Sequence, residues 1–114
     1  MVNFPNEGDI IMLNLSPTKG NVRSGFRPCI VLSDSRFNKV LGLSIVAPIT
    51  NQKKGYPFEV QLRDGMKTTG VILTDHLCSV DLKSRMFKIV ESAPTSLLDE
   101  CREYVFSFMG GEDV

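Results

Sequence analysis

Short apolar segments bounded by glycine, proline or serine occupy most of the chain, and this pattern is typical of β-strands. We expect strands at residues 10–15, 28–33, 43–48, 58–62, 70–74 and 87–90. The run at 43–48 is nearly continuous, which indicates a strand buried on both faces. In the fourth run the residues alternate, so that Phe58, Val60 and Leu62 share one face. The chain is therefore predicted to form a small, strongly coiled sheet.

The end of the chain follows a different period. Apolar residues recur at helical spacing and face away from the charged ones: Leu97, Leu98, Cys101, Val105, Phe108 and Met109 against Asp99, Glu100, Arg102 and Glu103. Ser96 with Asp99 resembles a capping box, and the glycines at 110–111 supply a stop. Asp34 offers the N-cap of a shorter helix that Gly42 would close. The predicted fold class is mainly β with one C-terminal helix.

Length and hydropathy bound the class of protein. A chain of 114 residues is large enough for one domain, residues 1–114, with a core of its own. No apolar run approaches the roughly 18 residues of a membrane span, and no charged segment precedes an apolar stretch at the start. We therefore expect a soluble, cytoplasmic protein without a membrane association.

Cysteine and histidine usage argues against a metal or redox site. The three cysteines lie far apart and form no C-x-x-C pair, so we expect Cys29 and Cys101 to be buried free thiols. The single histidine, His76, has no partners at metal-ligand spacing. There is no Walker loop and no G-x-S-x-G elbow. No cofactor is expected.

Charge is unevenly distributed along the chain although the formal net charge is zero. Residues 10–58 contain seven Lys and Arg against one acid, whereas residues 91–114 contain six acids against one Arg. The loop between the first two predicted strands holds Lys19, Arg23 and Arg27 and no acid. Such asymmetry indicates a one-sided electrostatic field, and a cationic loop held between strands suits a polyanion.

Several sequence blocks resemble the MazF/PemK (Kid) family, toxins of bacterial toxin–antitoxin systems. The opening, residues 8–33, follows the family pattern G-[DE]-[IL]-hydrophobic, a P-T-x-G-like turn, and G-x-R-P before an apolar strand. Further blocks follow in the family's order at 46–50 (VAPIT), 54–60 (KGYPFEV), 70–76 (GVILTDH) and 80–85 (VDLKSR). The resemblance implies an SH3-like small barrel of the PemK/CcdB-like type. It also implies a homodimeric, sequence-specific, metal-independent endoribonuclease that a labile MazE-like antitoxin inhibits.

The resemblance also implies catalytic residues. Arg27 matches the arginine of the R-P motif, which is implicated in catalysis, and its planar fork of donors suits a phosphate. Thr50 matches a strand-end threonine that contacts the scissile region; alternatively it satisfies its own turn. Asp75 matches an acid/base of the PemK branch, although that branch's arginine two positions earlier is Leu73 here. His76 stands where glutamine is common and is either a proton carrier or a structural contact.

One departure concerns the first loop. Many members have a glutamate there that is a candidate general base, and the corresponding position here is Val22. The polar content of the loop is then Asn21, Arg23 and Arg27, a set better suited to holding phosphate than to moving protons. The identity of the general base is left open.

Single-stranded RNA is usually bound by stacking of bases on aromatic rings and by cations along the backbone. Phe26 and Tyr56 are expected in loops and are the stacking candidates, whereas Phe58 is expected in the core. Lys53 and Lys54 would follow the phosphates. The RNA-binding candidates are Lys19, Asn21, Arg23, Phe26, Lys53, Lys54 and Tyr56.

A ribonuclease can dispense with a metal because the 2′-hydroxyl of RNA attacks the adjacent phosphate, assisted by a base, a cation and an acid. The products are a 2′,3′-cyclic phosphate and a 5′-hydroxyl. A gyrase-binding poison like CcdB is the alternative, but such chains lack the blocks at residues 25–28 (GFRP) and 68–71 (TTGV). A catalytically weakened relative that mainly binds RNA or an antitoxin is the third reading, and Val22 is the feature that favours it.

Overall fold

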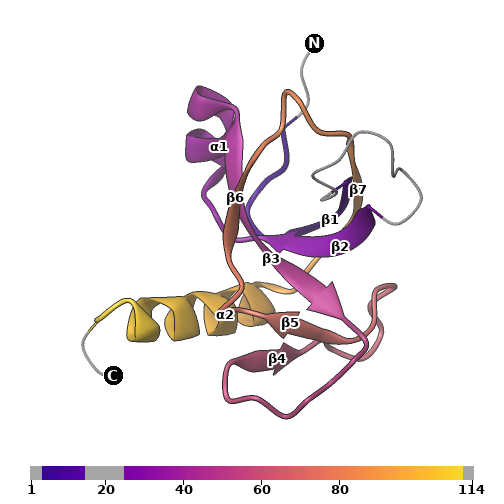
Figure 1. Cartoon of the computed structure of the whole chain (residues 1–114), viewed down its shortest axis with the longest axis vertical. Coiled ribbons are helices and arrows are strands. Elements are labelled where there is room, and N and C mark those ends of the chain that lie inside the picture. Colours follow the sequence, from indigo (N-terminus) through magenta and orange to yellow (C-terminus); the bar gives the residue numbers. More distant parts are fainter. Residues whose placement is uncertain (1–3, 15–24, 112–114) are drawn as a thin grey trace.

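This computed structural model describes residues 4–14 and 25–111 of the chain, which contain seven strands and two helices (Figure 1). In chain order they are β1 (Asp9–Asn14), β2 (Phe26–Val31), α1 (Ser35–Leu41), β3 (Leu43–Thr50), β4 (Glu59–Gln61), β5 (Val71–Leu73), β6 (Cys78–Asp81), β7 (Phe87–Ser92) and α2 (Thr95–Phe108). Each predicted strand is found, and each of its ends lies within two residues of the predicted one. The strand β6 was missed, because four residues with one buried valine give only a weak pattern.

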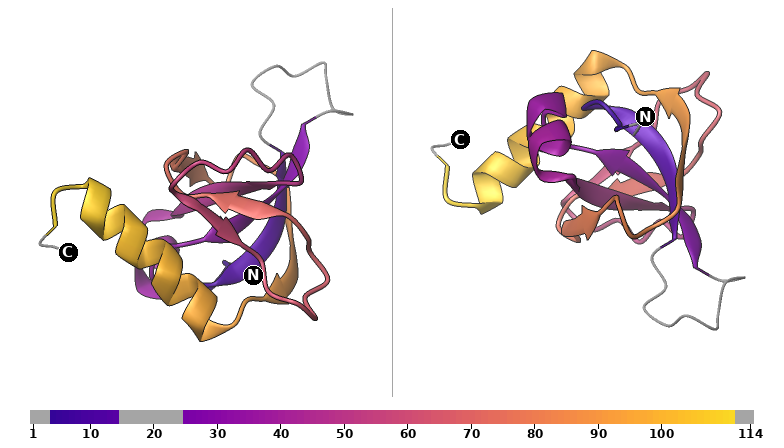
Figure 2. Two further views of the ribbon diagram at one scale, coloured as in Figure 1. Left: turned by 90° about the horizontal axis from the view of Figure 1, so that it is seen from below. Right: turned by 90° about the horizontal axis from the view of Figure 1, so that it is seen from above.

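All strand pairs are antiparallel, in the order β4-β5-β3-β2-β1-β7, with β6 also paired to β3. Strand β3 is the hub: one edge pairs with β2, and the other pairs first with β6 and then, at Ile49 and Thr50, with β5. The sheet therefore coils around β3, with α2 lying along one side of it (Figures 1 and 2). This confirms a mainly β, barrel-like fold with a C-terminal helix.

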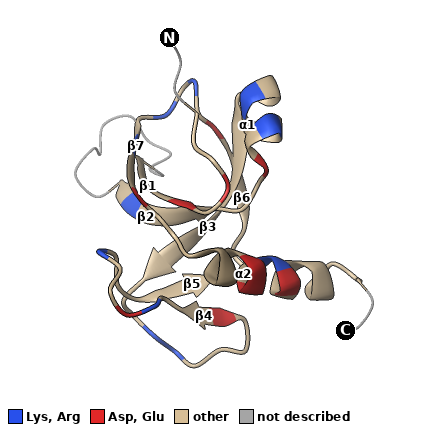
Figure 3. Ribbon diagram, turned by 180° about the vertical axis from the view of Figure 1, so that it is seen from behind, with Lys and Arg blue, Asp and Glu red and all other residues tan. Residues whose placement is uncertain are grey.

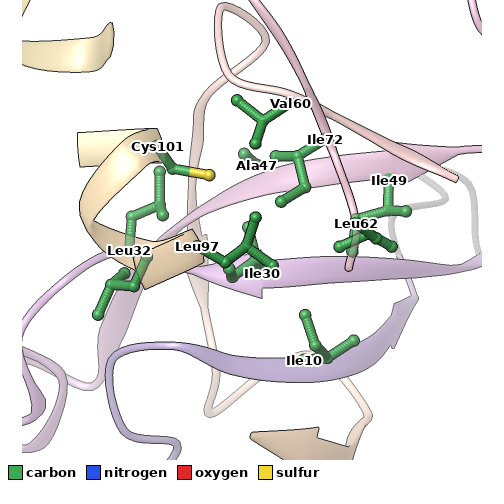
Figure 4. Close-up of a cluster of buried hydrophobic side chains, with 11 residues drawn as sticks. Ile10, Ile30, Leu32, Ala47, Ile49, Val60, Leu62, Ile72, Leu97 and Cys101 are labelled. Atoms are coloured by element: carbon green, nitrogen blue, oxygen red, sulfur yellow. The ribbon is translucent and has the colours of Figure 1, made fainter. Parts of the chain in front are cut away.

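The strands separate two apolar clusters, because successive side chains of a strand point to opposite faces. One cluster lies between the sheet and α2 and contains Ile10, Ile30, Leu32, Ala47, Ile49, Val60, Leu62, Ile72, Leu97, Leu98 and Cys101 (Figure 4). The other contains Ile11, Leu13, Cys29, Val31, Val46, Val80 and Leu82. Val46 and Ala47 belong to different clusters, so the prediction that this strand is buried on both faces is confirmed. Each fully buried Ile or Leu contributes about 1.5–3 kcal/mol.

The predicted thiols are also confirmed. Cys29 and Cys101 are fully buried and free, one in each cluster. Burial raises the pKa of both thiols to about 12. They behave as small apolar side chains and stay protonated at any ordinary pH.

The predicted N-cap is confirmed for helix α1 and is wrong for helix α2. Asp34 caps α1 as predicted, since its Oδ1 accepts a hydrogen bond from the backbone N–H of Arg36 at 2.8 Å. The capping box predicted at Ser96 is wrong. Helix α2 begins two residues earlier than that box requires, at Thr95, and its N-cap is Pro94, whose carbonyl accepts from the N–H of Leu97. This start places Leu97, which is buried, in the first turn, and no side chain caps the helix.

Candidate functional site

The ends of β2 and β3 bring two predicted catalytic residues to the same edge of the sheet. The last pair between these strands is Cys29 with Pro48, and Arg27 and Thr50 each lie two residues beyond it in the same direction. Because side chains alternate, both also lie on the face shared by Cys29 and Pro48. Arg27 is exposed and pairs through its backbone with Leu13 of β1, so it sits in a strand.

Phe26 differs from its prediction. It is the first residue of β2, half-buried and paired with Asn14, and not a loop residue. The reason is that the strand begins two residues before the predicted start at Pro28, because Arg27 and Phe26 still pair with β1. Phe26 therefore has less ring surface free for stacking than a loop residue would have.

Thr50 is held from two sides. Its Oγ1 accepts a hydrogen bond from the backbone N–H of Gln52 at 3.1 Å, so the threonine does satisfy its own turn. The hydroxyl hydrogen is still available for donation. On the other side Gly70, at φ +117°, packs directly against the chain: a Cβ there would lie 2.9 Å from the carbonyl carbon of Thr50 and closer to its oxygen.

A cleft of about 180 Å³ opens beside Thr50. Its lining residues are Thr50, Gln52, Lys54, Tyr56, Glu59, Leu73 and His76. Four of these were predicted as site residues from separate sequence blocks. Tyr56 is 56% exposed, so its ring face is open to a ligand. Arg27, Lys53 and Asp75 are described but do not line this cleft.

Glu59 is a cleft residue that the sequence analysis missed. Its carboxylate accepts hydrogen bonds from the backbone N–H groups of Lys54 at 3.1 Å and Gly55 at 3.0 Å. These two bonds fix the exposed segment 51–57, which carries the predicted RNA-binding residues, onto the start of β4. Glu59 alternates with Phe58 and Val60 and so falls on the polar face of the strand, and that pattern holds no signal for such a bond.

Asp75 and His76 lie in the turn after β5, which a hydrogen bond from the N–H of His76 to the carbonyl of Leu73 closes. The Nε2 of His76 is 3.8 Å from Oδ1 of Asp75, and the two side chains are 57% and 44% exposed. At such exposure an ion pair with a protonated imidazole adds little stability. His76 also lines the cleft, whereas Asp75 does not.

The remaining predicted residues divide into two groups. Lys53 is exposed next to Lys54. Lys19, Asn21 and Arg23, together with Val22, lie outside the described residues.

Acidic residues lie on α2, beside a basic one, and basic residues lie on α1 and β2, but acidic and basic residues are mixed over the rest of the sheet (Figure 3). The one-sided electrostatic field therefore stays a prediction. Within the described ranges no three His, Cys, Asp or Glu side chains form a group that could hold a metal ion. No helix of residues 4–14 or 25–111 is long and apolar enough to cross a membrane.

Comparison with known proteins assigns the fold and the family. The family of PemK-like, MazF-like toxins of type II toxin–antitoxin systems matches residues 6–108. The MazF endoribonuclease toxin of Escherichia coli K12 is 42% identical over 81 residues, 71% of this chain and 72% of that protein. The PemK endoribonuclease of Escherichia coli is 34% identical over 97 residues, 82% of this chain and 73% of that protein.

Solved structures agree. Deinococcus radiodurans MazF superimposes with a TM-score of 0.85 at 38% identity, covering 96% of this chain and 99% of that one. A MazE–MazF crystal structure from the same organism gives a TM-score of 0.84 at 36% identity, covering 97% of this chain and 100% of the other. The resemblance noted in the sequence is therefore confirmed, and the chain belongs to the family of PemK-like, MazF-like toxins of type II toxin–antitoxin systems.

Proposed function

We propose that this toxin cleaves single-stranded RNA at the edge formed by the ends of β2, β3 and β5. Its curated relatives are named endoribonucleases, which supports RNA cleavage over the poisoning of gyrase. The observation that carries the location is the cleft, because it gathers Thr50, Lys54, Tyr56 and His76 from three separate sequence blocks.

The reaction is a transesterification. A base takes the proton of the 2′-hydroxyl, the 2′-oxygen bonds to phosphorus, and the bond from phosphorus to the 5′-oxygen breaks as an acid protonates that oxygen. Arg27 offers two parallel donors and a permanent charge to the dianionic phosphorane. Thr50, whose hydroxyl oxygen already accepts from Gln52, donates its hydrogen to a phosphate oxygen. The products are a 2′,3′-cyclic phosphate and a 5′-hydroxyl.

His76 is the proton carrier in this scheme. It is the one imidazole in the sequence and it lines the cleft, and imidazoles as a class change charge near neutral pH. Its Nε2 lies 3.8 Å from Oδ1 of Asp75. Together with Asp75, His76 takes the acid/base role of the glutamate that many family members have where this chain has Val22.

RNA is held by the segment that Glu59 fixes. Tyr56 presents an exposed ring, and stacking on such a ring is worth about 1–3 kcal/mol per base. Lys53 and Lys54 contact the phosphates on either side. Because every residue of segment 51–57 is exposed, unlike those of the strands, this segment is also where base preference is expected to be set.

The same surface is proposed to receive a MazE-like antitoxin, with the toxin as a homodimer. A MazE–MazF complex is known for the Deinococcus radiodurans relative. An acidic, partly disordered peptide can cover a large basic surface and compete with RNA there. We expect the toxin to act in the cytoplasm, where its proposed substrate is found.

The test is cleavage of a long RNA in the presence of EDTA, followed by analysis of the fragment ends. Arg27→Ala should lose about 100- to 1000-fold in rate, the usual loss for one transition-state contact, and should keep its thermal stability. Arg36→Ala is the matched control, since Arg36 is an exposed arginine on α1 that pairs with Asp34. A folded Arg27→Ala protein with full activity would refute the site. A wild-type protein that binds RNA without cutting it would favour the weakened relative.

A further inference from the structure

Both carboxylate oxygens of Glu91, in β7, accept hydrogen bonds from a loop that is distant in the sequence. Its Oε1 accepts from the backbone N–H of Lys67 at 3.0 Å, and its Oε2 accepts from the N–H and the hydroxyl of Thr68, both at 2.7 Å. Burial raises the pKa of this carboxyl, but the hydrogen bonds from Thr68 and Lys67 outweigh burial and leave the pKa below its ordinary value. The charged form is therefore the one that holds the loop.

A β-bulge aims Glu91 at this loop. Ile11 of β1 pairs with Ile89, but the next pair is Ile10 with Glu91, so Val90 is an extra residue on β7. Ile89 packs against the cluster of Ile11, whereas Ile10 belongs to the opposite cluster, beneath α2. Glu91, two residues from Ile89, would share the face of Ile89 in a regular strand. The bulge moves it to the other face, towards residues 67–68.

The loop that Glu91 holds ends at the candidate active site. After Thr68, the hydroxyl of Thr69 lies 3.1 Å from Oδ1 of Asn51, and Gly70 packs against the carbonyl of Thr50. The carbonyl of Gly70 also accepts from the backbone N–H of Leu62 at 3.1 Å. A continuous set of contacts thus joins the carboxylate of Glu91 to the strand end that carries Thr50.

We infer that Glu91 is a positioning residue for RNA cleavage, which sets the place of Thr50 through the loop at residues 67–70. The inference rests on the proposed function of the Thr50 edge. It does not give Glu91 contact with RNA, because the carboxylate is occupied by the loop. The bulge at Val90 then serves the reaction, because it turns Glu91 towards this loop.

The experiment measures geometry and reaction separately. Glu91→Gln keeps the size of the side chain, but an amide has one acceptor oxygen and cannot accept on both sides of the loop. Thr68→Val removes the hydroxyl bond alone and serves as the milder variant. Glu103→Gln, at an exposed position of α2, is the control for loss of one negative charge. Each protein is studied by amide hydrogen exchange without RNA and by cleavage kinetics.

Glu91→Gln should accelerate exchange in residues 67–73 and 49–52. It should also lower kcat by roughly 10- to 100-fold, as a displacement of about 1 Å does, with KM changed less than about threefold. Thr68→Val should change both in the same direction by less, and Glu103→Gln should change neither. Unchanged exchange in residues 49–52 would overturn the inference, whatever the activity.

The proposed function fails in a different way. Faster exchange in residues 49–52 with an unchanged kcat would keep the mechanical link but remove Thr50 from the reaction, and with it the role of Glu91. A wild-type protein without cleavage activity would refute the proposed function and leave the exchange results intact.

Discussion

Replacement of Gly70 by alanine tests the contact on which the site depends. The backbone at Gly70 has φ +117°, a conformation that costs a residue with a side chain about 1–3 kcal/mol. The added Cβ would also lie 2.9 Å from the carbonyl carbon of Thr50 and 3.1 Å from Oδ1 of Asn51, too close for backbone that cannot turn away. Overpacking of this kind adds about 1–3 kcal/mol. We expect Gly70→Ala to lower the free energy of unfolding by about 4 kcal/mol and Tm by roughly 10–20 °C.

Gly65→Ala separates the two contributions. Gly65 also has a positive φ, +89°, but a Cβ there meets nothing within 4 Å. The control therefore carries only the backbone strain, and the difference between the two variants measures the contact with Thr50, about 1–3 kcal/mol. Urea unfolding at 25 °C gives both values, and cleavage assays on the folded fraction should show lower kcat for Gly70→Ala alone. Equal stability and activity of the two variants would show that Gly70 does not support the end of β3.

Three further outcomes are expected. The pKa of Glu91 lies below the ordinary 4.5, so its contribution to stability is complete above pH 4.5 and is lost as the pH falls through the folded-state pKa. In urea unfolding, the free energy of unfolding of Glu91→Gln should therefore fall less steeply with decreasing pH than that of the wild type. Native protein treated with a thiol reagent at pH 8 should react at Cys78 first, since burial holds the pKa of Cys29 and Cys101 at about 12; equal rates for all three would contradict the buried placement. His76→Gln should remove the limb of the rate–pH profile near neutrality if the imidazole carries a proton, and a profile of unchanged shape would assign His76 a structural role.

The sequence alone predicted the features that repeat along the chain. Strand alternation identified Val60 and Leu62 as inward-facing, and both are buried. Helical spacing identified Leu97, Leu98 and Cys101 as the buried face of α2, although Phe108 and Met109, at its end, are exposed. The cap at Asp34 followed from its own side chain and the next two residues. These features depend on backbone geometry and on neighbours within one turn, and both can be read from the chain itself.

The family blocks went further, since they predicted residues of one cleft from separate segments. Thr50, Tyr56 and His76 do line a common cavity. Their catalytic and binding roles stay predictions, as do those of Lys19, Asn21 and Arg23, which lie outside the described residues.

Tertiary structure decided which distant groups meet. Glu59 reads as the polar face of a strand, and only the path of the preceding segment brings two N–H groups to it. Glu91 and Ile89 are two residues apart, so their side chains would share a face of a regular strand. One extra residue in the pairing of β7 with β1 puts them on opposite faces. Nothing in the local pattern marks that bulge, because it depends on how β7 registers against a strand some 80 positions earlier in the chain. Periodicity is a property of the chain itself, whereas register is settled only when both strands and the core between them pack together.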